Sequence, residues 1–301
     1  MQKADSNLSA FAKEKTMIID AHTHTFPEKI ADKVIAQLQD KAKSRAYTKG
    51  TDAALNQSMK EADIDVSVLL PVMTNPAQVE KLNSIAIEKN RNFGETGLFS
   101  LGGMHPDFEG FSAELKRLCE NGITAIKLHP AYQNVDLDDI RYLRIIDKAN
   151  ELELATVIHA GLDIGIMHHN FSSIKHICTV LKEINPEKFV LAHMGGWKCW
   201  DDVESTLAGE NVYMDTAFSL GSYEPPKEYS VPKEETEMLG TEQFERIVKK
   251  HGCDKILFAT DSPWSSQAET LCRVKACCFD SDGLEHILFK NAQKVYRIPN
   301  R

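Results

Sequence analysis

This sequence lacks several features that would place it in particular classes of protein. It has no apolar stretch near the roughly 20 residues that a membrane-spanning helix needs. It has no excess of basic residues, since its formal net charge is -9. That charge argues against nucleic acid or an anionic membrane as a general partner, because both require a basic surface. Residues 1–16 have no apolar signal-peptide core, so we expect a flexible leader there, with Met17 as a candidate natural start.

Paired cysteine motifs are also missing. The seven cysteines are odd in number and show no C-x-x-C spacing. This argues against a zinc ribbon or a disulfide framework and is typical of a reducing compartment. We therefore expect a cytoplasmic protein whose cysteines are mostly small buried side chains rather than catalytic nucleophiles.

Short apolar runs bounded by turn residues are what the sequence does contain. Such runs are typical of strands buried on both faces of a parallel sheet. They begin near Met17, Val66, Gly97, Ile123, Leu154, Phe189, Val212 and Ile256. Patterns with helical period lie between most of them. At 301 residues, this alternation predicts an α/β fold, a single (β/α)₈ barrel over residues 17–301. A doubly wound open sheet would lead us to expect a Gly-rich phosphate loop after an early strand, and none is present.

Ionisable side chains follow several of these runs. His22 and His24 are two residues apart behind an apolar run, so on a strand both imidazoles face the same way. His159, His193 and Asp261 each follow another run directly. Because parallel strands gather their C-terminal ends on one rim, we expect these five side chains to lie together. Imidazole is the commonest metal-ligating side chain, so the pattern indicates a metal site.

Other residues near strand ends are candidates for contacting a substrate. Lys127, His129 and His105 fall at predicted strand ends, and the two histidines each precede a proline. A purely structural role in a turn is the alternative for both histidines. The polar, Pro-rich segment Leu220–Gly240 is interpreted either as a surface excursion or as a lid over the barrel mouth.

Five motifs together resemble the amidohydrolase superfamily, and most closely its branch of amidohydrolase-related metal-dependent hydrolases and decarboxylases. They are, in order, I-I-D-A-H-T-H, I-K-L-H-P, V-I-H-A-G, L-A-H-M-G-G and F-A-T-D-S-P-W. The resemblance spans residues 18–298.

The resemblance also implies roles for particular residues. His22, His24 and His159 would be metal ligands, and Asp261 would touch both the metal and a catalytic water. His193 would bind a second ion in a two-metal site, or polarise the substrate or act as a base in a one-metal site. Lys127 corresponds either to a carboxylated lysine that bridges two ions or to a lysine that pairs with an anion.

The expected chemistry follows from this ligand set. Three imidazoles and a carboxylate suit one Zn²⁺ ion, although Mn²⁺, Co²⁺ or Fe²⁺ is compatible and a second ion is left open. Such an ion lowers the pKa of bound water to about 7. Asp261 would orient that water and accept its proton, and His193 would stabilise the oxyanion or protonate the leaving group. Our first hypothesis is a hydrolase that cleaves an amide, ester or lactone bond in a small polar metabolite.

Two alternatives stand beside that hypothesis. The first is a metal-dependent decarboxylase or hydratase of a small unsaturated or aromatic carboxylic acid. Arginine is scarce at the strand ends and Lys127 is the only obvious cation there, which mildly favours hydrolysis or a substrate with a single carboxylate. The second is an inactive barrel scaffold, which the intact series of ligands argues against. The expected partner is a small molecule rather than nucleic acid or a membrane, and a homo-oligomer is left open.

Overall fold

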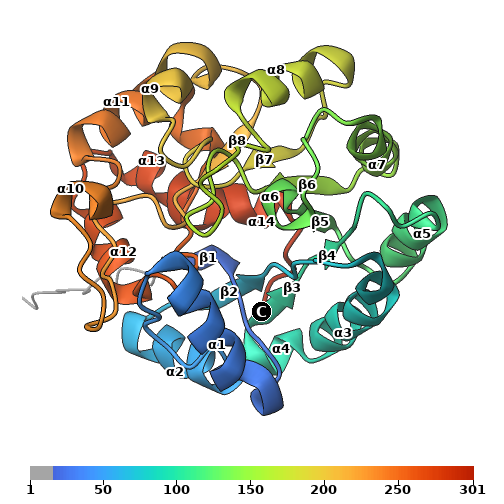
Figure 1. Ribbon diagram of the computed structural model, residues 1–301, viewed down its shortest axis with the longest axis horizontal. Coiled ribbons are helices and arrows are strands. Elements are labelled where there is room, and N and C mark those ends of the chain that lie inside the picture. Colours follow the sequence, from blue (N-terminus) through green and yellow to red (C-terminus); the bar gives the residue numbers. More distant parts are fainter. Residues whose placement is uncertain (1–15) are drawn as a thin grey trace, which may run out of the picture.

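The computed structural model describes residues 16–301. The predicted leader therefore lies outside the described residues, apart from its last position. Short strands stand at the centre of the molecule, with helices arranged around them (Figure 1). The strands are β1 (Ile19–Thr23), β2 (Val66–Leu69), β3 (Leu98–Ser100), β4 (Gly102–Gly103), β5 (Ala125–Leu128), β6 (Ala155–Ile158), β7 (Phe189–Leu191), β8 (Tyr213–Asp215) and β9 (Ile256–Leu257).

All paired strands are parallel and follow sequence order. β3 and β4 form one barrel strand interrupted at Leu101, whose backbone N–H donates to Leu69 of β2 at 2.9 Å. The last strand returns to the first, because Asp261 N–H donates to the carbonyl of His22 at 2.8 Å. The sheet is therefore a closed eight-stranded barrel, as predicted, with its C-terminal strand ends on one rim.

Helices connect the strands and cover the outside of the barrel. They are α1 (Glu28–Ala42), α2 (Asp52–Ala62), η1 (Pro76–Gln78), α3 (Val79–Arg91), α4 (Phe93–Thr96), α5 (Phe111–Glu120), α6 (Pro130–Gln133), α7 (Ile140–Glu151), α8 (Ile174–Glu183), α9 (Trp200–Asp202), η2 (Val203–Leu207), α10 (Lys233–Thr236), α11 (Thr241–His251), η3 (Cys253–Lys255), α12 (Gln267–Lys275), α13 (Ser281–Glu285), η4 (His286–Lys290) and α14 (Asn291–Val295). The sequence pattern predicts helices over residues 28–43, 78–90, 112–121, 138–152, 173–184, 201–207 and 242–251, and the structure has helical elements over each of these ranges. α12 was missed, although Ser266 caps it by accepting from Glu269 N–H.

Two groups of apolar side chains fill the molecule. The smaller group packs inside the barrel and includes Ile19, Ala125 and Val157. The larger one lies between the outer faces of the strands and the helices. Among the helices of residues 16–301, none is long and apolar enough to cross a membrane.

The cysteines depart from the expectation that most are buried. All seven are free; Cys272 and Cys278 are exposed and the other five are half-buried. They lie on helices and loops around the barrel, where one side meets solvent, and none lies on a barrel strand.

The segment Leu220–Gly240 is anchored to neighbouring elements at both of its ends. The backbone N–H of Arg45 donates to the carbonyl of Glu224 at 2.7 Å. From the other side, Lys198 Nζ donates to the carbonyl of Glu235 at 3.2 Å. A role as a lid stays a prediction.

Candidate metal centre

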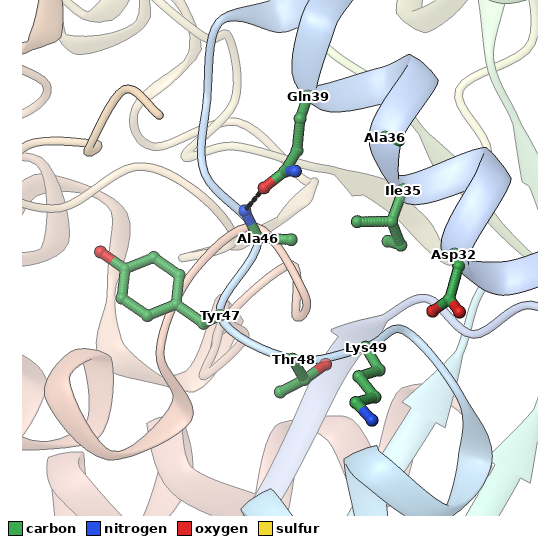
Figure 2. A pocket seen from close by; sticks show the side chains of 8 residues that line it. All are labelled: Asp32, Ile35, Ala36, Gln39, Ala46, Tyr47, Thr48 and Lys49. Carbon is green, nitrogen blue, oxygen red and sulfur yellow. Dashed lines mark hydrogen bonds between the residues drawn. The ribbon is translucent and has the colours of Figure 1, made fainter. Parts of the chain in front are cut away.

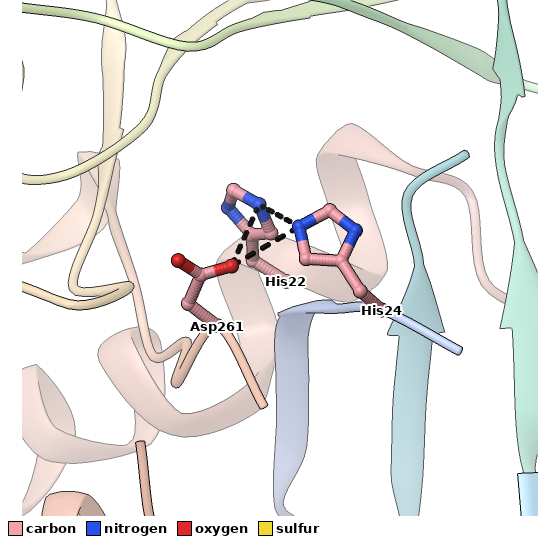
Figure 3. Close-up of side chains that lie close together, drawn as sticks. All are labelled: His22, His24 and Asp261. Carbon is pink, nitrogen blue, oxygen red and sulfur yellow. Dashed lines mark hydrogen bonds and ion pairs between the residues drawn. The ribbon is translucent and has the colours of Figure 1, made fainter. Parts of the chain in front are cut away.

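The first part of the centre lies where β1 meets the loop after β9. His22 and His24 end β1, and Asp261 follows β9. Asp261 Oδ1 lies 3.0 Å from Nε2 of His24 and 3.6 Å from Nε2 of His22. The two Nε2 atoms are 3.2 Å apart. Figure 3 shows the two rings and the carboxylate converging on one another, as the sequence predicted.

The second part comes from the ends of β6 and β7. His159 follows β6 and His193 follows β7, and Nε2 of His193 lies 3.0 Å from Nδ1 of His159. The rings form a continuous series: the centroids of His24 and His22 are 5.0 Å apart, those of His22 and His193 are 5.5 Å apart, and those of His193 and His159 are 4.6 Å apart. Both predicted parts thus belong to one cluster.

The outward-facing nitrogen of each ring identifies its tautomer. His22 Nδ1 lies 2.8 Å from a carboxylate oxygen of Asp215. The corresponding partners of His24 and His193 are carbonyl oxygens, each 2.8 Å from Nδ1. For His159 the partner is also a carbonyl, 3.2 Å from Nε2. Carbonyl and carboxylate oxygens only accept, so each outward nitrogen carries the proton and each inward nitrogen of a neutral ring is a lone pair.

Burial keeps three of these rings, those of His22, His159 and His193, neutral. It lowers the pKa of His22 and His159 well below the ordinary value of 6.5, with the positive charge of Lys127 acting in the same direction. Burial also lowers the pKa of His193. Burial alone would raise the pKa of Asp261, but its close contact with His24 and the charge that the neighbouring imidazoles gain on protonation hold that pKa below its ordinary value. The cluster therefore combines neutral imidazoles with an ionised carboxylate at neutral pH.

This donor set fits a divalent metal ion. Two ring nitrogens that face each other at 3.0–3.2 Å with no proton between them repel each other through their lone pairs. The negative charge of the Asp261 carboxylate repels these lone pairs as well. A cation among them removes that repulsion, and neutral histidine with aspartate suits Zn²⁺ or Mn²⁺. His22, His24 and Asp261 already lie within ligating distance of one another.

Asp215, at the end of β8, supports the cluster from behind. One of its oxygens accepts from His22 Nδ1, and the other accepts the backbone N–H of His193 at 2.9 Å. A carboxylate behind a metal-binding histidine fixes its orientation and makes it a better ligand. The sequence analysis missed Asp215, although it follows the seventh apolar run just as His193 follows the sixth.

Lys127, on β5, lies inside the barrel close to this cluster. Its side chain faces inward because Ala125, two residues earlier, belongs to the inner core. Lys127 is 1% exposed, and burial lowers its pKa from 10.5 to about 8. Its Nζ has no hydrogen-bond partner within the described chain.

His129 forms part of a stack of rings. It lies parallel between Tyr132 and His159, with centroids 4.1 and 4.2 Å away. Its Nε2 is 3.8 Å from Asp163 Oδ2, which is also 3.7 Å from His159 Nε2. These three residues have ligand types that could hold an ion. However, the outward Nε2 of His159 carries a proton for its carbonyl partner, so this group serves better to hold His159 in place.

His105, the remaining sequence candidate, is less central. Its Nδ1 accepts the backbone N–H of Asp107 at 3.1 Å, which is a turn contact. Substrate contact by His105 stays a prediction, as it does for His129 and Lys127.

A separate pocket of about 400 Å³ lies on the surface beside α1. Figure 2 shows its walls, where Gln39 Oε1 accepts the backbone N–H of Ala46 at 2.7 Å. It is lined by Asp32, Ile35, Ala36, Gln39, Ala46, Tyr47, Thr48 and Lys49. None of these belongs to the metal cluster.

Solved structures of similar fold place the barrel among known proteins. The 5-carboxyvanillate decarboxylase of Sphingomonas paucimobilis is 12% identical, with 95% of this chain and 100% of that chain covered and a TM-score of 0.65. A dihydroxybenzoic acid decarboxylase of Polaromonas, solved with manganese and an inhibitor, is 14% identical over 94% of this chain and 97% of that chain, with a TM-score of 0.67. An uncharacterized TIM-barrel protein of Bordetella bronchiseptica is 13% identical over 93% and 98%, with a TM-score of 0.68.

Comparisons of sequence give the family. No curated protein matches this chain. The sequence profile of the amidohydrolase family, however, matches residues 19–298, nearly the whole chain. The match begins in β1, before the paired histidines, and ends beyond α14. The chain therefore belongs to the amidohydrolase family, as its strand-end motifs predicted.

Proposed function

We propose that this protein is a metal-dependent decarboxylase of a small aromatic or unsaturated carboxylic acid. The observation that carries the proposal is the convergence of inward lone pairs from His22, His24, His159 and His193 with the Asp261 carboxylate. Two structures of similar fold are aromatic acid decarboxylases, which favours this reaction over the hydrolysis that we first expected.

The chain's residues have distinct roles in this proposal. His22, His24, His159 and Asp261 would hold one divalent ion. When bound, the ion supplies positive charge that attracts an anionic substrate and stabilises negative charge developing on it. In the reaction the bond between a carbon atom and its carboxylate breaks, its electron pair stays on that carbon, and CO₂ leaves. A proton must then reach the same carbon.

Asp261 and His193 would relay that proton, because each presents a lone pair to the site: either group would take a proton from water, leaving hydroxide, and deliver it to the carbon. Both are buried, and both border the space between the ring nitrogens. Hydrogen bonding of His193 Nδ1 to the carbonyl of Ala217 fixes the ring so that Nε2 faces that space. General acid–base groups of this kind contribute about 10²–10⁴ in rate.

Hydrolysis of an amide, ester or lactone is the second candidate. The same residues would hold the ion, with Asp261 orienting water and His193 stabilising an oxyanion. Membership in a family named for amide hydrolysis favours it.

The identity of the ion belongs to the proposal as well. The donor set led us to expect Zn²⁺, whereas the Polaromonas decarboxylase contains manganese. We propose a divalent ion, with Mn²⁺ as the first to test and Zn²⁺ as its competitor. Residues 17–301 would form one domain, and the free thiols support our proposal of a cytoplasmic location.

One experiment separates the two reactions. Metal-free protein is reconstituted with Mn²⁺ or Zn²⁺ and supplied with 5-carboxyvanillate or 2,6-dihydroxybenzoate, and released CO₂ is measured. In parallel, a panel of small amides, esters and lactones is assayed for hydrolysis. We expect metal-dependent CO₂ release that Asp261→Asn abolishes. Hydrolysis of the panel without CO₂ release from any carboxylic acid would reject the decarboxylase and support the second candidate.

A further inference from the structure

Lys127 is a buried ammonium group that the metal cluster does not use. At neutral pH it is mostly protonated, because its pKa of about 8 lies above 7. An ammonium group has three N–H donors, and leaving a buried charge without hydrogen bonds is costly. Yet Nζ of Lys127 has no hydrogen-bond partner anywhere in residues 16–301.

The nearby carboxylates are engaged elsewhere. Asp215, Asp261 and Asp163 all interact electrostatically with Lys127. Asp215 accepts from His22 and from the backbone of His193. Asp261 faces the two histidines of β1. None of these carboxylates accepts a hydrogen bond from Lys127 Nζ. The described chain therefore leaves this buried ammonium group without a hydrogen-bonded anion.

The position of Lys127 restricts what that partner can be. The side chain lies inside the barrel, and its charge acts on His22, His159 and His193, so it adjoins the metal cluster. The inward nitrogens of those rings are neutral lone pairs, so they do not balance the positive charge of Lys127. An anion in this space would contact the ammonium group and meet a bound metal ion as well.

We propose that Lys127 binds a carboxylate group of the substrate. This contact would make the site prefer carboxylates over neutral compounds of the same shape. The inference rests on the proposed function only in taking the substrate to be a carboxylic acid. A hydrogen bond to a charged group contributes about 1.5–3 kcal/mol. By the relation of about 1.4 kcal/mol per tenfold, this corresponds to roughly 10- to 100-fold in affinity.

The test compares benzoate with benzamide, which share shape and differ in charge. Their affinities for the metal-loaded protein are measured by calorimetry, for the wild type, for Lys127→Met and for Lys33→Met. Lys33 is an exposed lysine on α1, so its variant makes the same change of charge away from the site. We expect Lys127→Met to weaken benzoate binding by about 10- to 100-fold. Benzamide binding and metal content should stay as in the wild type, and Lys33→Met should match the wild type throughout.

Equal benzoate affinity in wild type and metal-loaded Lys127→Met would overturn the proposal. Because binding needs no turnover, a protein that distinguishes benzoate from benzamide through Lys127 but releases no CO₂ would reject only the proposed reaction.

A structure of the wild type with benzoate keeps the proposal testable if Lys127→Met does not fold. A benzoate oxygen at a charge-assisted distance of about 2.7–2.9 Å from Nζ would support it. Benzoate bound away from Nζ would overturn it. A carboxyl group attached covalently to Nζ would overturn it too, because the ammonium charge would be replaced by an anion.

Discussion

Nε2 of His193 lies 3.0 Å from Nδ1 of His159, and neither nitrogen carries a proton when the rings are neutral. Each ring has its single proton on the opposite nitrogen, where it meets a carbonyl oxygen. Two lone pairs held this close are unfavourable without a cation or a donor beside them. The contact therefore indicates a site shaped for a positively charged ligand.

His193 should affect catalysis more than metal retention. His193→Ala should keep its ion, because His22, His24, His159 and Asp261 are still present. Turnover should fall by about 10²–10⁴, the usual contribution of an acid–base group. Metal content and rate are both measured, once a substrate is known. Loss of the ion in His193→Ala would make His193 a ligand instead.

Asp215 should set metal affinity without touching the ion. Asp215→Asn replaces the carboxylate behind His22 Nδ1, so the ring loses its anionic partner. Changes at such supporting groups typically cost about 10- to 100-fold in metal affinity. Competition with a chelator measures the affinity, and Asp32→Asn, an exposed change on α1, is the control. Unchanged affinity in Asp215→Asn would show that Asp215 is only a packing residue.

Lys127 should destabilise the metal-free protein. Burial lowers its pKa from 10.5 to about 8, so the unfolded chain binds the proton more tightly than the folded one. A shift of this size corresponds to about 3 kcal/mol below pH 8. Metal-free Lys127→Met should therefore be more stable than the wild type at pH 7, by up to that amount.

The same shift predicts how this difference depends on pH. Between pH 8 and 10.5 the unfolded wild type binds more protons than the folded one, so its stability relative to Lys127→Met should rise. Denaturant unfolding at pH 7 and at pH 10 measures the change. A difference between the two proteins that does not narrow with pH would argue against a buried charge at Lys127.

Lys198 should hold the segment Leu220–Gly240 against the barrel. Its Nζ donates to the backbone carbonyls of Glu235 and Glu237, and Lys198→Ala removes both bonds. We expect faster proteolytic cleavage within the segment and a change of less than about 1 kcal/mol in overall stability, because the contacts are at the surface. If the segment is a lid, KM should also change; an unchanged KM would favour a surface excursion.

The barrel, and the strand-end positions of the residues that we propose as metal ligands, followed from local sequence patterns. In a parallel barrel, residues at the C-terminal ends of the strands lie on one rim. An apolar run that ends in His22, His159 or Asp261 therefore predicts that this side chain lies on that rim. The break in the third strand at Leu101 and the helix α12 were not predicted. Each is marked by only a few residues, such as Ser266 before α12, so neither stood out from the surrounding sequence. The cysteines were wrongly expected to be buried, since their positions on outer helices and loops were not weighed.

The finer geometry of the site could not be predicted from one sequence. The ring orientations depend on acceptors that come from other strands, such as the carbonyls of Leu70 and Ala217. The stack of His129 on His159 and the unpartnered ammonium group of Lys127 also arise only when separate strands meet. Asp215 is different, because its position after the seventh run was visible and was overlooked.

The metal content of the purified protein tests the account most directly. Protein loaded with Mn²⁺, freed of excess ion and analysed by mass spectrometry should hold one ion per chain. His22→Ala should lose it, whereas His176→Ala, a change on α8 away from the cluster, should keep it. Full occupancy in His22→Ala, or no tightly held divalent ion in the wild type, would contradict the metal centre on which the proposed function depends.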